Sequence, residues 1–143
     1  MEKQKFRARW ADLDPNFHMR HSVYSDYAAD TRMAGLDAIG ISKSMLMKLK
    51  IGPILFNEFI EYFKEIGPNE EFTVDFVTLG GSKKGHKWKM CNNIYKANGD
   101  LAAKITVMGA WFDLAARKVT APPEEMKSLL DKVPRGEGFI EDL

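Results

Sequence analysis

The residues best suited to chemistry lie in one short segment near the start of the chain. Asp12 and Asp14 stand one residue apart at the end of a strand-like stretch, and Pro15 keeps Asp14 out of helical geometry. An amphipathic helix is predicted over residues 22–39. The start of a helix offers unpaired N–H groups and a partial positive charge, which polarise a carbonyl group while a nearby carboxylate attacks it or activates water. The segment is therefore suited to attack on a carbonyl carbon.

Residues 12–24 resemble the motif of the hotdog-fold acyl-CoA thioesterases of the 4-hydroxybenzoyl-CoA thioesterase type. In that motif Asp-x-Asp is followed by Gly-His, a short polar stretch and Tyr. Asp12, Asp14, His18 and Tyr24 fall in register with it. The resemblance implies that Asp14 is the catalytic carboxylate, which would act as nucleophile or as general base on water. It covers roughly residues 5–130, and its specific part is the region around Asp14.

Two positions in this segment depart from the family motif. Phe17 stands where glycine is usual, and His21 stands where asparagine is common. A bulky aromatic side chain at position 17 is expected to narrow the acyl pocket or to redirect the loop. We therefore place Phe17 and His21 among the predicted substrate-binding residues.

The other polar residues of the motif have a structural alternative beside the functional one. Asp14 itself could be only a helix cap, because Asp, Pro and Asn are common in turns. Asp12 is better explained as a structural carboxylate that accepts hydrogen bonds from loop amides. His18 is expected to line the pocket near the thioester or to orient the loop. Tyr24 could offer its hydroxyl to the site, although a buried core aromatic is the more frequent case.

A metal site is a weaker interpretation of the same residues. Asp12, Asp14, His18 and His21 are spaced Asp-x-Asp-x3-His-x2-His. The loop between them would have to fold back to bring four ligands together. The resemblance implies no metal and no cofactor, with coenzyme A entering only as part of the substrate.

The glycine-rich turn at residues 80–86 is the second candidate for binding. It lacks the Lys and Ser or Thr that a phosphate-binding Walker A loop carries directly after its second glycine. The resemblance implies that this turn helps to hold the phosphopantetheine and nucleotide part of coenzyme A. Ser82, Lys83 and Lys84 are its candidate contacts. The alternative is a solvated hairpin with lysines at its tip.

Other carboxylates and nucleophiles are less well supported. No Gly-x-Ser-x-Gly sequence is present, and Cys91 lies within a predicted strand, where we expect a partly exposed thiol without a catalytic role. Asp26 and Asp30 lie on the predicted long helix, where a second branch of hotdog thioesterases carries its carboxylate, and Asp30 would be the better counterpart. Glu58 interrupts an apolar strand pattern and would line a cavity or sit at a subunit edge.

The elements that must position these residues follow from periodicity and turn residues. Residues 5–10 alternate charged and apolar side chains, as a half-buried strand does, and residues 22–39 place many small side chains on one helical stripe. A shorter helix is predicted over residues 42–49, with Ser42 as its N-cap. Strands are predicted at residues 54–66, 71–79, 86–96 and 101–113, a helix from residue 122, and a loose tail over residues 131–143.

This order of elements predicts an α+β architecture with one antiparallel sheet. The small residues on the long helix suit a helix that a curved sheet wraps closely. The arrangement matches the hotdog fold that the resemblance implies, an antiparallel five-stranded sheet around a long central helix. Residues 1–143 are expected to form a single domain of this kind.

Composition limits the partners and the compartment. The chain has 143 residues, 45% of them hydrophobic, so it can form a real core, and its net charge of +1 gives no general attraction to nucleic acid or anionic membrane. One cysteine excludes an intrachain disulfide. The N-terminus lacks the apolar stretch of a signal peptide, and no apolar run reaches the roughly 20 residues of a membrane helix. We expect a cytoplasmic protein with no nucleic acid partner and no membrane span.

These observations together predict an acyl-CoA thioesterase. A lone sheet leaves an edge to cover, and the resemblance implies pairing of sheets, so we expect a homodimer or homotetramer with sites between subunits. The nearest alternatives are a thioesterase for acyl carrier protein substrates and a non-catalytic module that binds acyl thioesters. A hotdog dehydratase ranks last because the expected His and Asp arrangement on the helix is missing.

Overall fold

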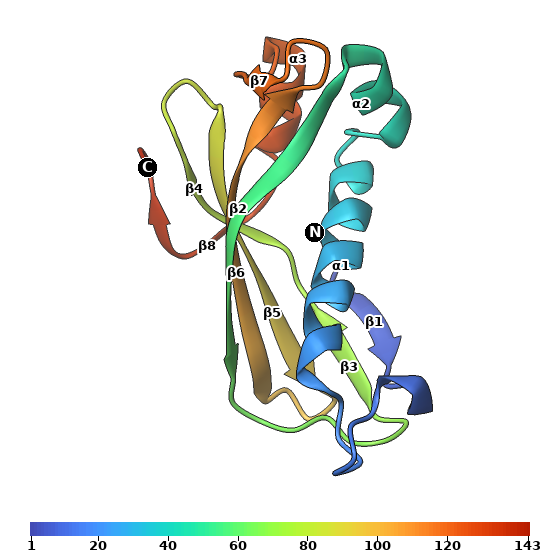
Figure 1. Ribbon diagram of the computed structural model, residues 1–143. Coiled ribbons are helices and arrows are strands. Elements are labelled where there is room, and N and C mark those ends of the chain that lie inside the picture. Colours follow the sequence, from blue (N-terminus) through green and yellow to red (C-terminus); the bar gives the residue numbers. More distant parts are fainter.

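The computed structural model describes all 143 residues and shows one curled sheet with a long helix along one face (Figure 1). The central helix, α1, spans Tyr24–Ala38 and is extended at its start by the 3-10 turn η2, His21–Val23. The sequence predicts the same helix over residues 22–39. The remaining helical elements are η1 (Trp10–Asp12), α2 (Lys43–Leu49) and α3 (Glu124–Leu130). None of the helices has the length and apolar composition needed to span a bilayer.

Eight strands make up the sheet, where the sequence predicts five. The difference comes from one predicted strand that is divided in two and from two short strands that the sequence pattern does not reveal. The long strands run side by side in the order β1, β3 with β4, β5, β6 and β2. Their bounds are β1 Gln4–Arg7, β2 Ile51–Tyr62, β3 Glu71–Val74, β4 Val77–Gly81, β5 Lys87–Lys96, β6 Leu101–Asp113, β7 Lys118–Val119 and β8 Arg135–Ile140.

The division between β3 and β4 has a side-chain cause. Asp75 lies between the two strands, and its carboxylate accepts hydrogen bonds from the backbone N–H of Asn93 at 2.6 Å and from the Asn93 side-chain amide at 3.0 Å. These bonds replace part of the regular ladder with β5. The register with β5 is the same on both sides of the interruption, since Val74 faces Ile94 and Val77 faces Cys91.

The C-terminal residues correct one expectation. The sequence predicts a loose tail over residues 131–143, but Arg135–Ile140 forms β8, which runs parallel to β4. Gly80 makes this contact possible, because it has a φ of +147° and a Cβ at this position would lie 2.5 Å from the carbonyl oxygen of Ile140. Together β1 and β8 cover the outer edge of β3 and β4.

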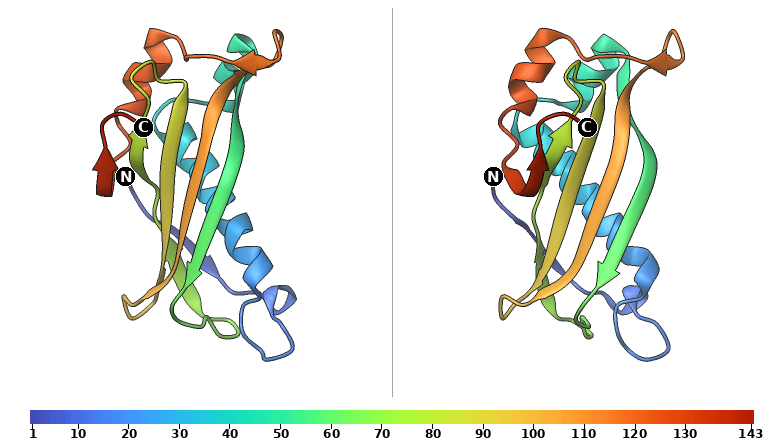
Figure 2. Two further views of the ribbon diagram at one scale, coloured as in Figure 1. Left: turned by 60° about the vertical axis from the view of Figure 1, so that its left-hand side comes forward. Right: turned by 90° about the vertical axis from the view of Figure 1, so that its left-hand side faces the viewer.

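The opposite edge of the sheet is formed by β2, which pairs only with β6 (Figure 2). This strand is twelve residues long and has a bulge at Phe56. A long unpaired strand normally carries charges or proline along its edge. Here the strand carries Pro53, Glu58 and Glu61, but it also exposes large hydrophobic side chains at its middle and end, namely Leu55, Phe56, Phe59 and Tyr62, with Phe63 directly after the strand.

The helix α1 lies close against the sheet because several of its inward residues are small. Ala28 and Thr31 are buried, and a Cβ at Gly35 would lie 2.3 Å from the ring of Phe76 on the sheet side. The expected close approach of other elements to the small-residue stripe is therefore confirmed. The short helix α2 likewise begins as predicted, since the Ser42 hydroxyl accepts a hydrogen bond from the N–H of Met45 at 3.1 Å.

Replacing Gly35 by alanine tests this packing. Alanine normally stabilises a helix relative to glycine by about 0.5–1 kcal/mol, but here its methyl group would overlap Phe76. We expect Gly35→Ala to lower the free energy of unfolding by about 1–3 kcal/mol, measured by urea denaturation. Gly67→Ala is the matched control, because nothing lies within 4 Å of its Cβ position. A more stable Gly35→Ala protein would contradict the packing.

Candidate active site

The carboxylate of Asp12 anchors the N-terminal loop from inside the protein. Its side chain is 0% exposed and accepts hydrogen bonds from the backbone N–H of Arg9 at 3.0 Å and from the Arg9 guanidinium at 2.8 and 3.2 Å. The hydroxyl of Tyr27 on α1 donates to the same carboxylate. The structural role predicted for Asp12 is confirmed, although most of its donors belong to side chains and only one to a loop amide.

Burial alone would raise the pKa of Asp12 because it disfavours the charged form. The hydrogen bonds from Arg9 and Tyr27 outweigh burial and lower the pKa of Asp12 from 3.8 to about 2. Burial, and to a smaller degree the hydrogen bond to Asp12, raise the pKa of the Tyr27 hydroxyl. Asp12 is therefore a carboxylate at neutral pH and has no capacity left for chemistry.

Asp14 lies in a tight loop two residues beyond this anchor. A β-bridge between Leu13 and Met19 closes the loop at its base. One carboxylate oxygen of Asp14, Oδ1, accepts hydrogen bonds from the N–H of Asn16 at 2.8 Å and of His18 at 3.2 Å. The other oxygen, Oδ2, accepts no hydrogen bond within the chain. Asp14 is thus held by one oxygen while the second remains available.

Phe17 occupies the position where the family motif has glycine, and its backbone explains that preference. It has a φ of +60°, in the left-handed region that glycine adopts without strain. The loop therefore keeps the conformation expected of a glycine. The side chain is 70% exposed and does not line the cavity beside Asp14 within this chain.

A cavity of about 330 Å³ gathers the predicted residues at the start of the helical segment. It is lined by Asp14, His18, His21 and Tyr24, together with the end of β2 and the residues that follow it. The loop is tied to that part of the chain, since the Nε2 of His18 lies 3.1 Å from Glu65 Oε2 and the N–H of Met19 donates to the carbonyl of Ile66. Four residues chosen from sequence spacing thus surround one space.

Tyr24 occupies the inner wall of this cavity. Its ring is buried and packs edge-on against Tyr62, with ring centroids 5.1 Å apart. Tyr62 in turn donates a hydrogen bond to the carbonyl of His21 at 3.1 Å. Burial, followed by neighbouring acidic groups that include Asp14, raises the pKa of Tyr24 to about 12. The Tyr24 hydroxyl therefore stays protonated at neutral pH and is a hydrogen-bond donor rather than a base.

The alternative carboxylates and the cysteine lie elsewhere. Asp26 and Asp30 line a separate cavity beside Arg7 and Arg9, away from Asp14. The expectation of a partly exposed Cys91 is wrong, because the thiol is buried and burial raises its pKa to about 11. No group of three or more His, Cys, Asp or Glu side chains is arranged to hold a metal ion.

The glycine-rich turn borders a second, polar cavity of about 520 Å³. Ser82 and Lys83 line it, while Lys84 is exposed and does not. The Ser82 hydroxyl lies 3.0 Å from the Nδ1 of His86 and accepts a hydrogen bond from the N–H of Lys87, so it holds the turn together. Lys83 lies 4.0 Å from a carboxylate oxygen of Asp142.

Sequence analysis missed further cations at this cavity. Lys87 and Lys127 line it and form no ion pair within the chain, and Arg135 lines it while pairing with Glu141 at 3.1 Å. Lys127 lies on α3 and Arg135 on β8. Neither could be found from sequence, because only the folded chain brings α3 and the C-terminal strand to the turn.

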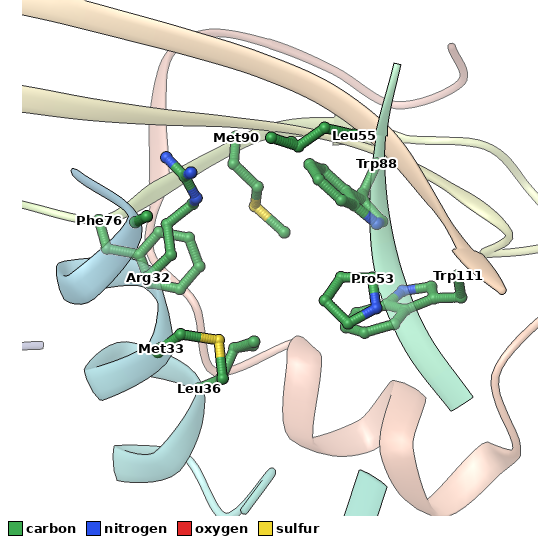
Figure 3. Close-up of a pocket in the computed structure, with 10 residues that line it drawn as sticks. Arg32, Met33, Leu36, Pro53, Leu55, Phe76, Trp88, Met90 and Trp111 are labelled. Carbon is green, nitrogen blue, oxygen red and sulfur yellow. The ribbon is translucent and has the colours of Figure 1, made fainter. Parts of the chain in front are cut away.

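A third cavity, of about 150 Å³, lies between α1 and the sheet (Figure 3). Its wall is almost entirely apolar and includes the tryptophans Trp88 and Trp111, which also border the polar cavity. Arg32 is the one charged side chain in the wall and lies on the side of the cavity opposite the two tryptophans. A regular helical stripe gives no signal for an inward arginine, so sequence analysis did not select it.

Comparison with known proteins identifies the class to which this fold and site belong. The family model of the thioesterase-like superfamily matches residues 8–130. The chain therefore belongs to the thioesterase-like superfamily, and its fold is the hotdog fold predicted from the sequence. No curated protein matches the chain.

Solved structures share the fold at low sequence identity. A hypothetical protein from Staphylococcus aureus, characterised in complex with CoA, is 18% identical with a TM-score of 0.84, covering 99% of this chain and 92% of its own. A DHNA-CoA thioesterase from Staphylococcus aureus is 17% identical with a TM-score of 0.81, and the match covers 91% of this chain and 88% of the thioesterase chain. A 1,4-dihydroxy-2-naphthoyl-CoA thioesterase from Synechocystis is 14% identical with a TM-score of 0.79, and the match covers 91% of this chain and 95% of the thioesterase chain.

The buried Asp12 carboxylate predicts a specific dependence of stability on pH. Its pKa is lower in the folded chain than in the unfolded chain, so the carboxylate stabilises the fold above pH 3.8, and this contribution disappears as the pH falls to about 2. We expect Asp12→Asn to lower the free energy of unfolding by about 2 kcal/mol at pH 7. Urea denaturation of both proteins at several pH values measures the difference, which should shrink in acid. If the difference in free energy of unfolding between wild type and Asp12→Asn stays constant down to pH 2, the pKa of Asp12 is not lowered in the folded chain and the prediction is wrong.

Proposed function

We propose that this protein hydrolyses acyl-CoA thioesters and that Asp14 is the reacting carboxylate. The observation that carries this proposal is the cavity in which Asp14, His18, His21 and Tyr24 meet at the start of the helical segment. Membership of the thioesterase-like superfamily supports the same class of reaction. The CoA named in the description of one similar structure supports the substrate class.

The geometry of the site suggests a division of labour among its residues. The carbonyl carbon of the thioester would lie against the free oxygen of Asp14, which attacks it directly or removes a proton from an attacking water. The N–H groups at the helical start beside His21 and the neutral hydroxyl of Tyr24 would stabilise the developing oxyanion. If Asp14 activates water, the water oxygen forms the new C–O bond as the C–S bond breaks. If Asp14 attacks directly, its oxygen forms a mixed anhydride as the C–S bond breaks, and a water then hydrolyses this anhydride to release the carboxylic acid and restore Asp14. By either route the departing thiolate takes up a proton that comes from the water, which gives free CoA.

The polar cavity near the glycine-rich turn would hold the phosphates of coenzyme A. Lys87 and Lys127 form no ion pair within the chain and Lys83 is weakly paired, while the carboxylates in the same wall are Glu124, Asp131 and Glu141. Phosphate groups are bound by lysine as a point charge. The apolar and polar cavities share Trp88 and Trp111, so an acyl group and a nucleotide arm could occupy neighbouring spaces in one chain.

A second copy of the chain would complete the site. The edge of β2 is long and unpaired and exposes several large hydrophobic side chains, which is the property expected of a surface that another strand covers. Antiparallel pairing of β2 with its copy about the middle of the strand would place the Tyr62 end of one chain beside the Pro53 end of the other. Because Tyr62 lines the Asp14 cavity and Pro53 lines the apolar cavity, the pairing would bring these two cavities together.

Thiol release from short, long and aromatic acyl-CoAs tests the proposed reaction. We expect wild type to turn over at least one of them and Asp14→Asn to lose roughly 100- to 10,000-fold in kcat, because the reacting carboxylate is replaced by a neutral amide of the same shape. Asp30→Asn removes a carboxylate from α1 outside the cavity and distinguishes the two candidate carboxylates. Activity lost in Asp30→Asn and kept in Asp14→Asn would reverse the assignment.

The proposed subunit contact is tested by the mass of the protein in solution. Multi-angle light scattering should give about twice the chain mass of 16.3 kDa or a higher even multiple for wild type. Phe59→Glu places a charge on the apolar edge of β2 and should shift the mass toward the monomer. Met47→Glu is the control, since Met47 is exposed to a similar degree, 70% against 64% for Phe59, but lies on α2. A monomeric wild type would exclude the contact.

A further inference from the structure

The apolar cavity between α1 and the sheet contains one charge without a counter-charge. Nearly all of its wall is hydrophobic, and Arg32 supplies the single ionised group. Its volume of about 150 Å³ equals that of a protein cavity that holds one benzene molecule. The space thus fits a chain of about six carbons or one aromatic ring, with a cation at its border.

The guanidinium of Arg32 is held in place but is not neutralised. One of its nitrogens, Nη1, donates a hydrogen bond to the side-chain oxygen of Asn92 at 2.8 Å. Asn92 is completely buried and is itself fixed, because its amide donates to the carbonyl of Asp75 at 2.7 Å. A guanidinium has five N–H donors, so most of those of Arg32 lack a partner in the protein.

Arg32 is half-buried, so its charge is partly desolvated. Burial lowers the pKa of Arg32, and the carboxylate of Glu58 raises it from a distance too great for an ion pair. Arginine remains protonated in proteins, so the cost is not relieved by loss of the proton. A carboxylate within the cavity would satisfy the guanidinium in the two-pronged geometry that arginine favours.

Trp88 provides a second, independent sign of a missing acceptor. The indole Nε1 of this residue is buried and has no hydrogen-bond partner in the chain. Unpaired buried N–H groups are rare in folded proteins. Trp88 borders the same cavity as Arg32 on the opposite side, so the wall of this apolar space contains one half-buried guanidinium and one indole whose N–H group has no acceptor in the chain.

We propose that this cavity binds the far end of the acyl group and that Arg32 selects acyl groups ending in a carboxylate. The inference rests on the proposed thioesterase function and specifies its substrate class, an ω-carboxyacyl-CoA of about six carbons. Hydrophobic contact with Met33, Leu36 and the two tryptophans binds the methylene chain. The terminal carboxylate binds Arg32, and Asn92 acts as a positioning residue for the guanidinium.

The position of the cavity along α1 fits this role only in a pair of chains. Arg32 lies eight residues beyond Tyr24, which is about 12 Å along the helix and farther than a six-carbon acyl group reaches from Asp14 of the same chain. Antiparallel pairing of β2 brings the cavity near the partner's Asp14 instead. The thioester would then react at one chain while its acyl end is recognised by the other.

Adipoyl-CoA and hexanoyl-CoA test the inference, because both have six carbons and they differ in the terminal carboxylate. We expect wild type to have at least a tenfold higher kcat/KM for adipoyl-CoA. Arg32→Met keeps the length of the side chain and removes its charge, and it should lower kcat/KM for adipoyl-CoA by roughly 10- to 100-fold while leaving that for hexanoyl-CoA equal or higher. The kcat/KM of Arg32→Lys for adipoyl-CoA should lie between the values of wild type and Arg32→Met, because lysine keeps the charge but lacks the two-pronged geometry of arginine.

Arg7→Met is the matched control, because Arg7 forms an exposed ion pair with Glu71 on the sheet edge. Arg7→Met should leave the ratio of kcat/KM for adipoyl-CoA to kcat/KM for hexanoyl-CoA unchanged. A wild-type preference for hexanoyl-CoA would overturn the inference. An equal loss for both substrates in Arg32→Met and Arg32→Lys would also overturn it, because it would show a structural role for Arg32.

A binding measurement separates this inference from the proposed reaction. Trp88 and Trp111 border the cavity, so tryptophan fluorescence of the Asp14→Asn protein should change when adipoyl-CoA binds. Tighter binding of adipoyl-CoA than of hexanoyl-CoA, lost in the Asp14→Asn, Arg32→Met double variant, supports the carboxylate site even if wild type hydrolyses neither thioester. Equal binding of the two compounds together with normal turnover would refute the carboxylate site and leave the thioesterase function standing.

Discussion

The buried carboxylate of Asp12 is the interaction on which the site depends. A charged group inside a protein costs several kcal/mol unless it is paired and hydrogen-bonded, and Asp12 meets this condition through donors from Arg9 and Tyr27. Since Arg9 follows β1 and Tyr27 lies on α1, one carboxylate fixes the sheet edge, the loop and the helix relative to one another. The chain leaves this anchor in a defined direction, and two residues later Asp14 reaches the start of the helical segment. Asp14 keeps Oδ2 free because the loop N–H groups that hold its side chain donate only to Oδ1.

Much of this site could be predicted because its parts are close in sequence. Asp14, His18 and Tyr24 lie within eleven residues, so a short loop followed by a helix keeps them close together, and contacts with Glu65 and Ile66 then fix the loop. The same holds for Ser42, whose hydroxyl caps a helix that begins at the next residue. Phe17 does not belong to this group, because its side chain is expected from the sequence to narrow the pocket or to redirect the loop, but its backbone keeps the positive φ of a glycine and its side chain lies outside the Asp14 cavity of its own chain.

The parts that could not be predicted join residues that are far apart in sequence. Asn92 holds Arg32 across sixty positions, and Lys127 reaches the glycine-rich turn only because α3 packs over it. Strand β8 pairs with β4 in parallel, and no turn sequence predicts this pairing. The pairing needs a glycine at position 80, but from the sequence Gly80 is equally well explained as an ordinary turn residue. The break at Asp75 has a similar origin, because a side chain replaces backbone bonds without changing the hydrophobic pattern of the strand.

The arrangement of the three cavities gives a physical reason for an apolar sheet edge. Within one chain the carboxylate of Asp14, which we propose reacts, lies at the start of the helical segment, while the apolar and polar cavities lie farther along α1 and at its other end. A chain that acted alone would have a carboxylate without an acyl pocket, and it would also expose Phe59 and Leu55 on β2 without benefit. The proposed pairing of two β2 edges would remove both defects at once, because the strand that buries the aromatic side chains would also carry Tyr62 toward the Pro53 end of its copy. Selection against exposed hydrophobic side chains and selection for a complete site would thus favour the same proposed contact.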